Sequence, residues 1–239
     1  MNSVIITGAS AGIGRAVAER FAAAGWRVGL IARRAQVLEE MAAQMPAAVA
    51  LPCDVTDPQA VQSAFDTFCA KAGRLDVLFN NAGMFAAAAP IDELSLEDWR
   101  GIVDVNLHGM FHAARAAFGQ MRQQSPQGGR IINNGSVSAH APRAHSVGYT
   151  TTKHAITGLT KSLSLDGRAF DIACGQIDIG NARTELLEEL AAKTPDNPPP
   201  MMDVGHVAEA VLNMATLPPE ANVQFMTIMA TKMPYIGRG

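Results

Sequence analysis

The fold of this 239-residue chain is decided by the stretch Val4-Ile5-Ile6-Thr7-Gly8-Ala9-Ser10-Ala11-Gly12-Ile13-Gly14. An apolar run leads into a turn of small residues, and an alanine-rich segment of helical periodicity follows. Glycines permit a tight turn and let the backbone approach a pyrophosphate, which the N–H groups and dipole of the next helix attract. The spacing Gly-x3-Gly-x-Gly differs from the usual G-x-G-x-x-G fingerprint, and a plain tight turn is the alternative. The position between the first strand and the first helix favours dinucleotide binding.

Six further short runs of apolar and β-branched residues follow, separated mostly by alanine- and leucine-rich segments of helical periodicity. Such a pattern indicates a parallel sheet covered by helices on both faces. We therefore predict an α/β fold, a doubly wound, Rossmann-like sheet of seven parallel strands in a single domain, residues 1–239. The predicted strands are Val4–Thr7, Arg27–Ala32, Ala48–Cys53, Val77–Asn80, Arg130–Asn134, Ile172–Ile177 and Val223–Met229, and the predicted helices begin near Gly12, Ala35, Pro58, Ser95, Gly148 and Gly205.

Composition argues against several classes of function. A formal net charge of −3 provides no basic field for nucleic acid and no polybasic patch for a membrane. We find no signal peptide, and no apolar segment approaches the ~20 residues that span a bilayer. The three cysteines, Cys53, Cys69 and Cys174, are dispersed, without metal-ligand spacing. We therefore expect a cytoplasmic protein with reduced thiols and without a metal, a nucleic-acid partner or a membrane partner.

The end of the second predicted strand bears on the choice of cofactor. An Asp or Glu at this point would contact the adenosine ribose of NAD(H), but the chain reads Ala32-Arg33-Arg34. Two guanidinium groups could bind a 2′-phosphate, so we predict that NADP(H) is preferred over NAD(H). Alternatively, one or both arginines are solvated charges that open the next helix.

Tyr149 and Lys153 are four residues apart and share one face if their segment is helical. A phenol has an ordinary pKa near 10, and a nearby ammonium lowers it. A phenol tuned in this way can exchange a proton with a carbonyl oxygen while a hydride moves to or from a nicotinamide. Ser136 lies upstream at the end of a strand-like run, where its hydroxyl could hold the same substrate oxygen. A surface Tyr-x3-Lys pair is the alternative, and the combination with the glycine turn argues against it.

With these motifs the chain resembles the compact, single-domain branch of the short-chain dehydrogenase/reductase superfamily. The resemblance covers about the first three-quarters of the chain. Its motifs occur in the family's order and spacing: Thr7-Gly8-x3-Gly12-Ile13-Gly14, Asp54-Val55, Asn80-Asn81-Ala82-Gly83, Asn106, Ser136 and Tyr149-x3-Lys153.

The resemblance implies a role for each matched position. Tyr149 is the expected general acid/base, Lys153 lowers its pKa and holds the nicotinamide ribose, and Ser136 orients the substrate oxygen. Asn106 is expected to hold a water that links Lys153 to solvent. Ser138 is a weaker candidate for a secondary contact. The expected cofactor contacts are Gly8, Ser10, Ala11, Gly12, Ile13, Gly14, Arg33, Arg34, Asp54, Val55, Asn81, Ala82, Gly83, Tyr149, Lys153, Ile179 and Thr184.

The chain departs from the family pattern after the sixth predicted strand. Relatives commonly have Pro-Gly there, whereas this chain has Ile179-Gly180, with Thr184 at the expected spacing. Four prolines cluster between Thr194 and Met202, which indicates irregular structure. Residues 181–204 are therefore a substrate lid or an ordered surface excursion. The tail also differs, and Ala11 stands where NADP-preferring relatives often have a basic residue.

Function is predicted at the level of the reaction. We expect an NADP(H)-dependent oxidoreductase that acts on a small carbonyl compound or secondary alcohol and forms a homodimer or homotetramer. A non-catalytic dinucleotide-binding sensor or scaffold on the same fold is the alternative. His108 and His112 have a spacing that could bind zinc, but they lack a third ligand, so we expect a surface or interface role. His140 and His145 lie in the Ser–Tyr loop and are assigned no catalytic role.

Overall fold

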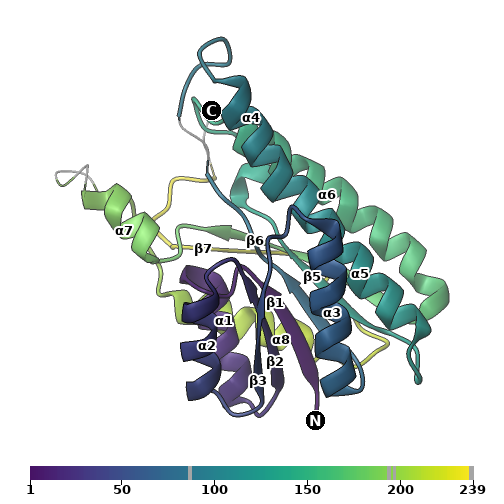
Figure 1. The fold of residues 1–239 in the computed structure, drawn as a ribbon. Coiled ribbons are helices and arrows are strands. Elements are labelled where there is room, and N and C mark those ends of the chain that lie inside the picture. Colours follow the sequence, from purple (N-terminus) through teal and green to yellow (C-terminus); the bar gives the residue numbers. More distant parts are fainter. Residues whose placement is uncertain (86–87, 193–194, 196–197, 237–239) are drawn as a thin grey trace.

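The structure is a computed structural model that describes residues 1–85, 88–192, 195 and 198–236. A seven-stranded parallel sheet in the order β3-β2-β1-β4-β5-β6-β7 forms its centre (Figure 1). The predicted α/β fold is confirmed, with small shifts at strand ends such as the start of β7 at Phe225 instead of Val223. The strands are β1 (Ser3–Thr7), β2 (Arg27–Ala32), β3 (Ala48–Pro52), β4 (Val77–Asn80), β5 (Gly129–Asn134), β6 (Ile172–Gly180) and β7 (Phe225–Met229).

The central strand β1 shows why the strands are apolar throughout. Successive side chains of a strand point to opposite faces, and both faces of this sheet are covered. Val4 and Ile6 belong to one hydrophobic cluster, and Ile5 between them belongs to the other. The sheet therefore has a core on each side.

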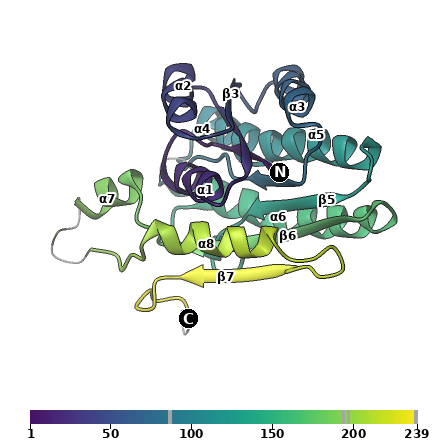
Figure 2. The same ribbon diagram turned by 90° about the horizontal axis from the view of Figure 1, so that it is seen from below.

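The helices form two layers (Figure 2). The first cluster contains side chains of α1, α2 and α8, and the second contains side chains of α3 and α5. α6 packs against β6 and against α4. None of the helices in the described part of the chain has the length and apolar character to cross a membrane. The bounds are α1 (Gly12–Ala23), α2 (Ala35–Gln44), α3 (Pro58–Ala72), α4 (Leu96–Val103), α5 (Met110–Gln123), α6 (Val147–Asp166) and α8 (Val204–Ala215).

A π-helical turn, Asp104–Gly109, joins α4 to α5. The predicted helix begins as expected, because the hydroxyl of Ser95 caps α4 by accepting the N–H of Asp98. The π turn was not expected from the sequence. Such turns often occur at functional sites, and this one contains Asn106.

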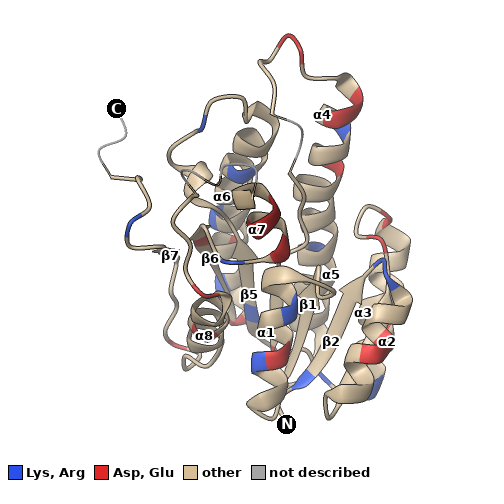
Figure 3. Cartoon of the chain, turned by 90° about the vertical axis from the view of Figure 1, so that its left-hand side faces the viewer, with Lys and Arg blue, Asp and Glu red and all other residues tan. Residues whose placement is uncertain are grey.

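The segment after β6 contains a helix that the sequence analysis did not predict, α7 (Glu185–Ala192). Acidic side chains are prominent on it (Figure 3). The base of the segment is closed by a bridge between Ala182 and Met202, and the N–H of Arg183 donates to the carbonyl of Met202. The proline-rich stretch predicted to be irregular lies partly outside the described residues.

Candidate active site

The glycine-rich turn follows β1 at the carboxyl edge of the sheet, where the strand order reverses between β1 and β4. Gly8 and Gly12 have φ values of +69° and +51°, which favour glycine. Within the described residues no side chain caps α1, whereas Asp57 and Asp203 cap α3 and α8. The first N–H groups of α1 are thus left for an anion, as a cofactor pyrophosphate requires. The predicted contacts Ser10, Ala11, Ile13 and Gly14 lie in or next to this turn.

Arg34 and Arg33 lie beside the turn at the end of β2. Nε and Nη2 of Arg34 donate to the Ser10 hydroxyl at 3.2 and 2.9 Å, and Nη2 also donates to the Ser10 carbonyl at 2.9 Å. Hydrogen bonds from Thr56 lower the pKa of Asp54, and the Arg33 guanidinium lowers it further. The turn, the arginines and Asp54 are therefore neighbours. Arg34 is thus bonded to the glycine turn, while the Arg33 guanidinium lies near Asp54.

Thr7 joins the end of β1 to the segment after β4. Its hydroxyl accepts the N–H groups of Asn81 and Ala82 at 2.8 and 2.9 Å. The side-chain amide of Asn81 donates to the Thr7 carbonyl, and its oxygen accepts from Asn134. Asn81 thus ties β1 to β5 with both ends of its side chain. Ala82 and Gly83 follow at the same edge, and a Cβ on Gly8 would lie 3.0 Å from Ala82 Cα.

Val55, a predicted cofactor contact, is buried against the π-helical turn. A Cβ on Gly109 would lie 2.7 Å from Val55 Cγ2, and the Val55 carbonyl bonds to Nδ1 of His112 at 3.0 Å. His108 bonds to Asp104 instead. The two histidines therefore have separate partners. In the described part of the chain, no three His, Cys, Asp or Glu side chains gather as metal ligands.

Tyr149 and Lys153 lie one turn apart on α6, with Nζ of Lys153 5.5 Å from the centroid of the Tyr149 ring. Lys153 is only 3% exposed, and its Nζ donates to the carbonyl of Asn134 at 2.7 Å. Ser136 follows two residues after Asn134, at the start of a 3₁₀ turn (Val137–Ala139), where its hydroxyl accepts the N–H of Ser138 at 3.1 Å. The structure thus brings the three predicted side chains to one place at the end of β5.

The pKa of Tyr149 is raised, which differs from the expectation that Lys153 lowers it. Burial raises it most, and the Ser136 hydroxyl and the Arg143 guanidinium act in the opposite direction. The ring of Phe85 contributes to this burial, because it stacks on the Tyr149 ring at 4.5 Å between centroids. Burial also lowers the pKa of Lys153 to about 8. Burial therefore favours the protonated phenol over the phenolate at Tyr149.

Asn106 is fully buried in the π-helical turn. Its Oδ1 accepts the N–H of Met84 at 2.7 Å, and its Nδ2 donates to the Met84 carbonyl at 2.9 Å. Nδ2 also reaches the hydroxyl of Thr152, next to Lys153, at 3.4 Å. The Asn106 side chain therefore fixes the segment after β4 beside the Tyr149–Lys153 helix.

Ile179 and Thr184 lie at the end of β6 and the start of α7. Ile179 is buried and pairs with Ile228 of β7, so its place in the strand is regular without the proline of relatives. Thr184 reaches the glycine-rich turn, because a Cβ on Gly12 would lie 3.2 Å from Thr184 Cγ2. Thr184 and Gly12 are therefore neighbours, and the contact of Thr184 with a cofactor stays a prediction.

Three residues of the site were not singled out from the sequence. Phe85 stacks on Tyr149, the Asn134 carbonyl holds Lys153, and Asp178 is a buried carboxylate in β6. Asp178 could have been noticed as an acid between two isoleucines in an otherwise uncharged strand. The other two act through ring stacking and a backbone carbonyl, for which the sequence contains no signal.

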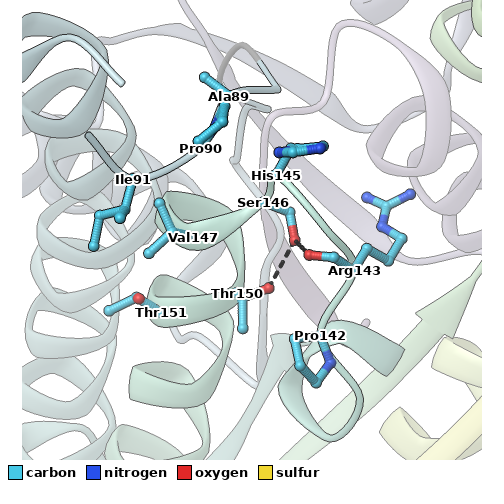
Figure 4. A pocket seen from close by; sticks show the side chains of 10 residues that line it. All are labelled: Ala89, Pro90, Ile91, Pro142, Arg143, His145, Ser146, Val147, Thr150 and Thr151. Atoms are coloured by element: carbon cyan, nitrogen blue, oxygen red, sulfur yellow. Dashed lines mark hydrogen bonds between the residues drawn. The ribbon is translucent and has the colours of Figure 1, made fainter. Parts of the chain in front are cut away.

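A pocket of about 300 Å³ opens beside the site (Figure 4). It lies between residues 89–91 and residues 142–151, and Ser146 donates across its rim to the Arg143 carbonyl at 2.7 Å. Thr150 lines it and Tyr149 does not. The pocket is therefore a space next to Tyr149, with Arg143 and His145 at its wall.

Comparison with known proteins agrees with this geometry. The family model described as short chain dehydrogenase matches residues 2–195. Sulfoacetaldehyde reductase 2 of Chromohalobacter salexigens is 31% identical and is aligned over 97% of this chain and 95% of its own. The closed form of serine dehydrogenase complexed with NADP⁺ has a TM-score of 0.91 and 28% identity, covering 99% and 98%. A 3-ketoacyl-(acyl-carrier-protein) reductase from Brucella melitensis complexed with NADH has a TM-score of 0.87 and 25% identity, covering 95% and 96%.

Proposed function

We propose that the chain, which belongs to the short-chain dehydrogenase family, uses NADP(H) to interconvert a small carbonyl compound and its secondary alcohol. Its relatives are dehydrogenases and reductases that bind nicotinamide cofactors. The observation that carries the proposal is the buried Lys153, fixed by the Asn134 carbonyl one helical turn from Tyr149 and close to Ser136. A buried ionisable side chain such as Lys153 is typical of active sites that transfer protons.

A nicotinamide cofactor, when bound, would supply or accept the hydride that the substrate carbon gains or loses. Ser136 holds the substrate oxygen, and Tyr149 gives it a proton during reduction or takes its proton during oxidation. The raised pKa of Tyr149 keeps the phenol protonated, which is the form that reduction requires. Lys153 binds the ribose and restores the proton of Tyr149.

The preference for NADP(H) is proposed from the end of β2. Arg34 is fixed on Ser10, and Arg33 is exposed nearby, so a 2′-phosphate would meet two positive charges where an NAD(H) enzyme has an acid. Solved relatives contain either NADP⁺ or NADH. The assignment therefore rests on these two side chains.

Further proposals concern the rest of the chain. We assign residues 1–239 to a single domain and residues 181–204 to a substrate lid, because Thr184 lies against Gly12 and a bridge closes the base of the segment. The three free, buried cysteines support a cytoplasmic location. A homodimer or homotetramer would cover Phe111 of α5 and Leu165 of α6, which are 49% and 60% exposed.

The testing experiment is a panel of aldehydes, ketones, sugars and secondary alcohols, each with NADPH, NADH and their oxidised forms. Turnover is followed by the absorbance of the reduced nicotinamide. The panel includes acidic substrates such as sulfoacetaldehyde and serine, because relatives act on them and Arg143 lies near Tyr149. Cofactor binding without turnover of any compound would favour the non-catalytic sensor.

A further inference from the structure

Asp178 is a buried acid beneath the active-site turn, and the proposed reaction does not use it. Its side chain is 1% exposed. Oδ1 accepts the backbone N–H of Ser136 at 2.9 Å and the side-chain amide of Gln176 at 2.7 Å, and Oδ2 bonds to Nε2 of His140 at 2.7 Å. Burial of a carboxylate is costly unless it is bonded in this way. Both carboxylate oxygens of Asp178 therefore have hydrogen-bond partners.

The carboxylate bonds to both ends of one short turn. Ser136 begins the 3₁₀ turn, and His140 follows it. Inside the turn, the N–H of Ala139 donates to the Ser136 carbonyl at 2.8 Å. Asp178 thus holds the backbone at the residue whose hydroxyl is proposed to orient the substrate, while the His140 ring, 41% exposed, closes over it from the solvent side.

The surrounding residues leave room for this carboxylate. A Cβ on Gly135 would overlap with Oδ1 of Asp178, so the residue before Ser136 has to be glycine. Gln176, the third partner, is itself fixed, because Thr160 donates to its oxygen at 3.1 Å and its amide reaches Thr157 at 3.1 Å. The position of the carboxylate is therefore determined from three sides.

The charge of Asp178 also acts on the proton-transfer pair. The ionisable groups that face it are His140 from the turn and Tyr149 and Lys153 from α6, while β7 has none. Its negative charge raises the pKa of both Tyr149 and Lys153, the latter against the effect of burial. Arg143 acts on Tyr149 in the opposite direction.

We propose that Asp178 is a positioning residue of the active site: with His140 it fixes the turn that carries Ser136. The inference rests on the proposed function, because it assumes that these groups act on a substrate.

Three variants separate the hold of Asp178 on the Ser136 turn from the effect of its charge on Tyr149 and Lys153. In Asp178→Asn the shape is kept and the charge is lost, since the amide oxygen can accept from Ser136 and Gln176 and its NH₂ can donate to the other tautomer of His140. In His140→Ala the charge of Asp178 is kept, and the hydrogen bond between Asp178 and the His140 ring is lost. Asp178→Ala removes both. Asp166→Asn, an exposed acid at the end of α6, is the matched control.

Activity is measured as kcat and kcat/KM against pH, with NADPH and the carbonyl compound of the panel that is reduced fastest. Asp178→Asn should lower the kinetic pKa of the proton-donating group, because the negative charge that raises it is lost. Asp178→Ala should reduce kcat about 100-fold, because the Ser136 turn moves. A kinetic pKa in Asp178→Asn equal to that of the unmodified enzyme would overturn the role of the charge, since a merely structural residue would change the rate without shifting the profile.

Hydrogen–deuterium exchange of residues 129–141 tests the positioning without any turnover. Exchange should rise in His140→Ala and further in Asp178→Ala, and should stay unchanged in Asp178→Asn and Asp166→Asn. Unchanged exchange in His140→Ala would contradict the role of the Asp178–His140 hydrogen bond in fixing the turn. This variant also keeps the test decisive if Asp178→Ala does not fold. If exchange rises as expected in an enzyme that reduces no carbonyl, the proposed function fails while the positioning role stands.

Discussion

At the carboxyl ends of β1, β4 and β5, buried side chains bond one strand to the next, as Thr7 and Asn81 do. In the segment after β6 a bridge joins Ala182 to Met202, and the helix α7 presents Leu186 and Leu190 with 48% and 43% exposure. The first region contains the family motifs, and the second contains the departures from them. The comparison suggests that the reaction depends on a rigid strand edge, while substrate choice depends on a segment that is less firmly held.

The largest effect is expected from Tyr149→Phe, which tests whether the rigid region performs the chemistry. Loss of the proton donor should reduce kcat about 1,000-fold, within the range for general acid catalysis, while NADPH binding is kept. Binding is measured by fluorescence titration and kcat by steady-state kinetics. A variant with nearly unchanged kcat would contradict the proposed mechanism.

Thr7→Val tests the rigidity itself. The change leaves the buried N–H groups of Asn81 and Ala82 without their acceptor, which should lower the free energy of unfolding by about 3 kcal/mol. The matched control is Thr227→Val, at an exposed position of β7, with an effect within about 0.5 kcal/mol. Urea unfolding measures both, and equal effects would remove the contrast between the regions.

Lys153→Met should stabilise the rigid region at the expense of activity. The pKa of Lys153 is about 8 in the folded chain against an ordinary 10.5, so the unfolded chain binds more protons between these pH values and wild-type stability rises with pH there. Below pH 8 the free energy of unfolding of the variant should exceed that of the wild type by about 2 kcal/mol. This figure already subtracts about 1 kcal/mol for the lost hydrogen bond to Asn134. Unfolding at pH 7, 9 and 10.5 should show this gain shrinking, and a constant gain would contradict the lowered pKa.

Arg33→Ala tests the proposed binding of the cofactor's 2′-phosphate at the end of β2. It should raise the KM for NADPH about tenfold and leave the KM for NADH nearly unchanged, because one contact to the 2′-phosphate is lost. Arg34→Ala should affect both cofactors, since Arg34 also holds Ser10 of the glycine turn. Arg168→Ala, at a distant exposed site, serves as the control. Equal changes for both cofactors in Arg33→Ala would refute the NADP(H) preference.

The smallest effect is expected from Leu186→Ala combined with Leu190→Ala on α7. Both side chains are largely exposed, so the free energy of unfolding should change by less than about 0.5 kcal/mol. The KM for the carbonyl substrate should change several-fold while the KM for NADPH stays constant. A large loss of stability, or no change in substrate KM, would argue against a lid.

The fold could be predicted from the sequence because the strands are buried on both faces and read as continuous apolar runs. The Tyr149–Lys153 pair could be predicted because four-residue spacing on a helix is a local property. In both cases the information lies within a short stretch of chain.

Other features depend on contacts between distant segments. The stacking of Phe85 on Tyr149 and the bond from Lys153 to the Asn134 carbonyl join residues that the fold brings together. The raised pKa of Tyr149 has the same origin, because the burial that dominates it comes from tertiary packing. The π-helical turn was missed because its residues also suit an α-helix.

The absence of room at Gly135 has a consequence for how this chain can change over evolutionary time. Asp178 and Gln176 of β6 occupy the space that a side chain at Gly135 would need. Any larger residue there is therefore excluded as a first step and becomes acceptable only after both neighbours have been exchanged for smaller ones. Gly135 and Asp178 therefore form an epistatic pair, so descendants that keep the acid are expected to inherit the glycine with it.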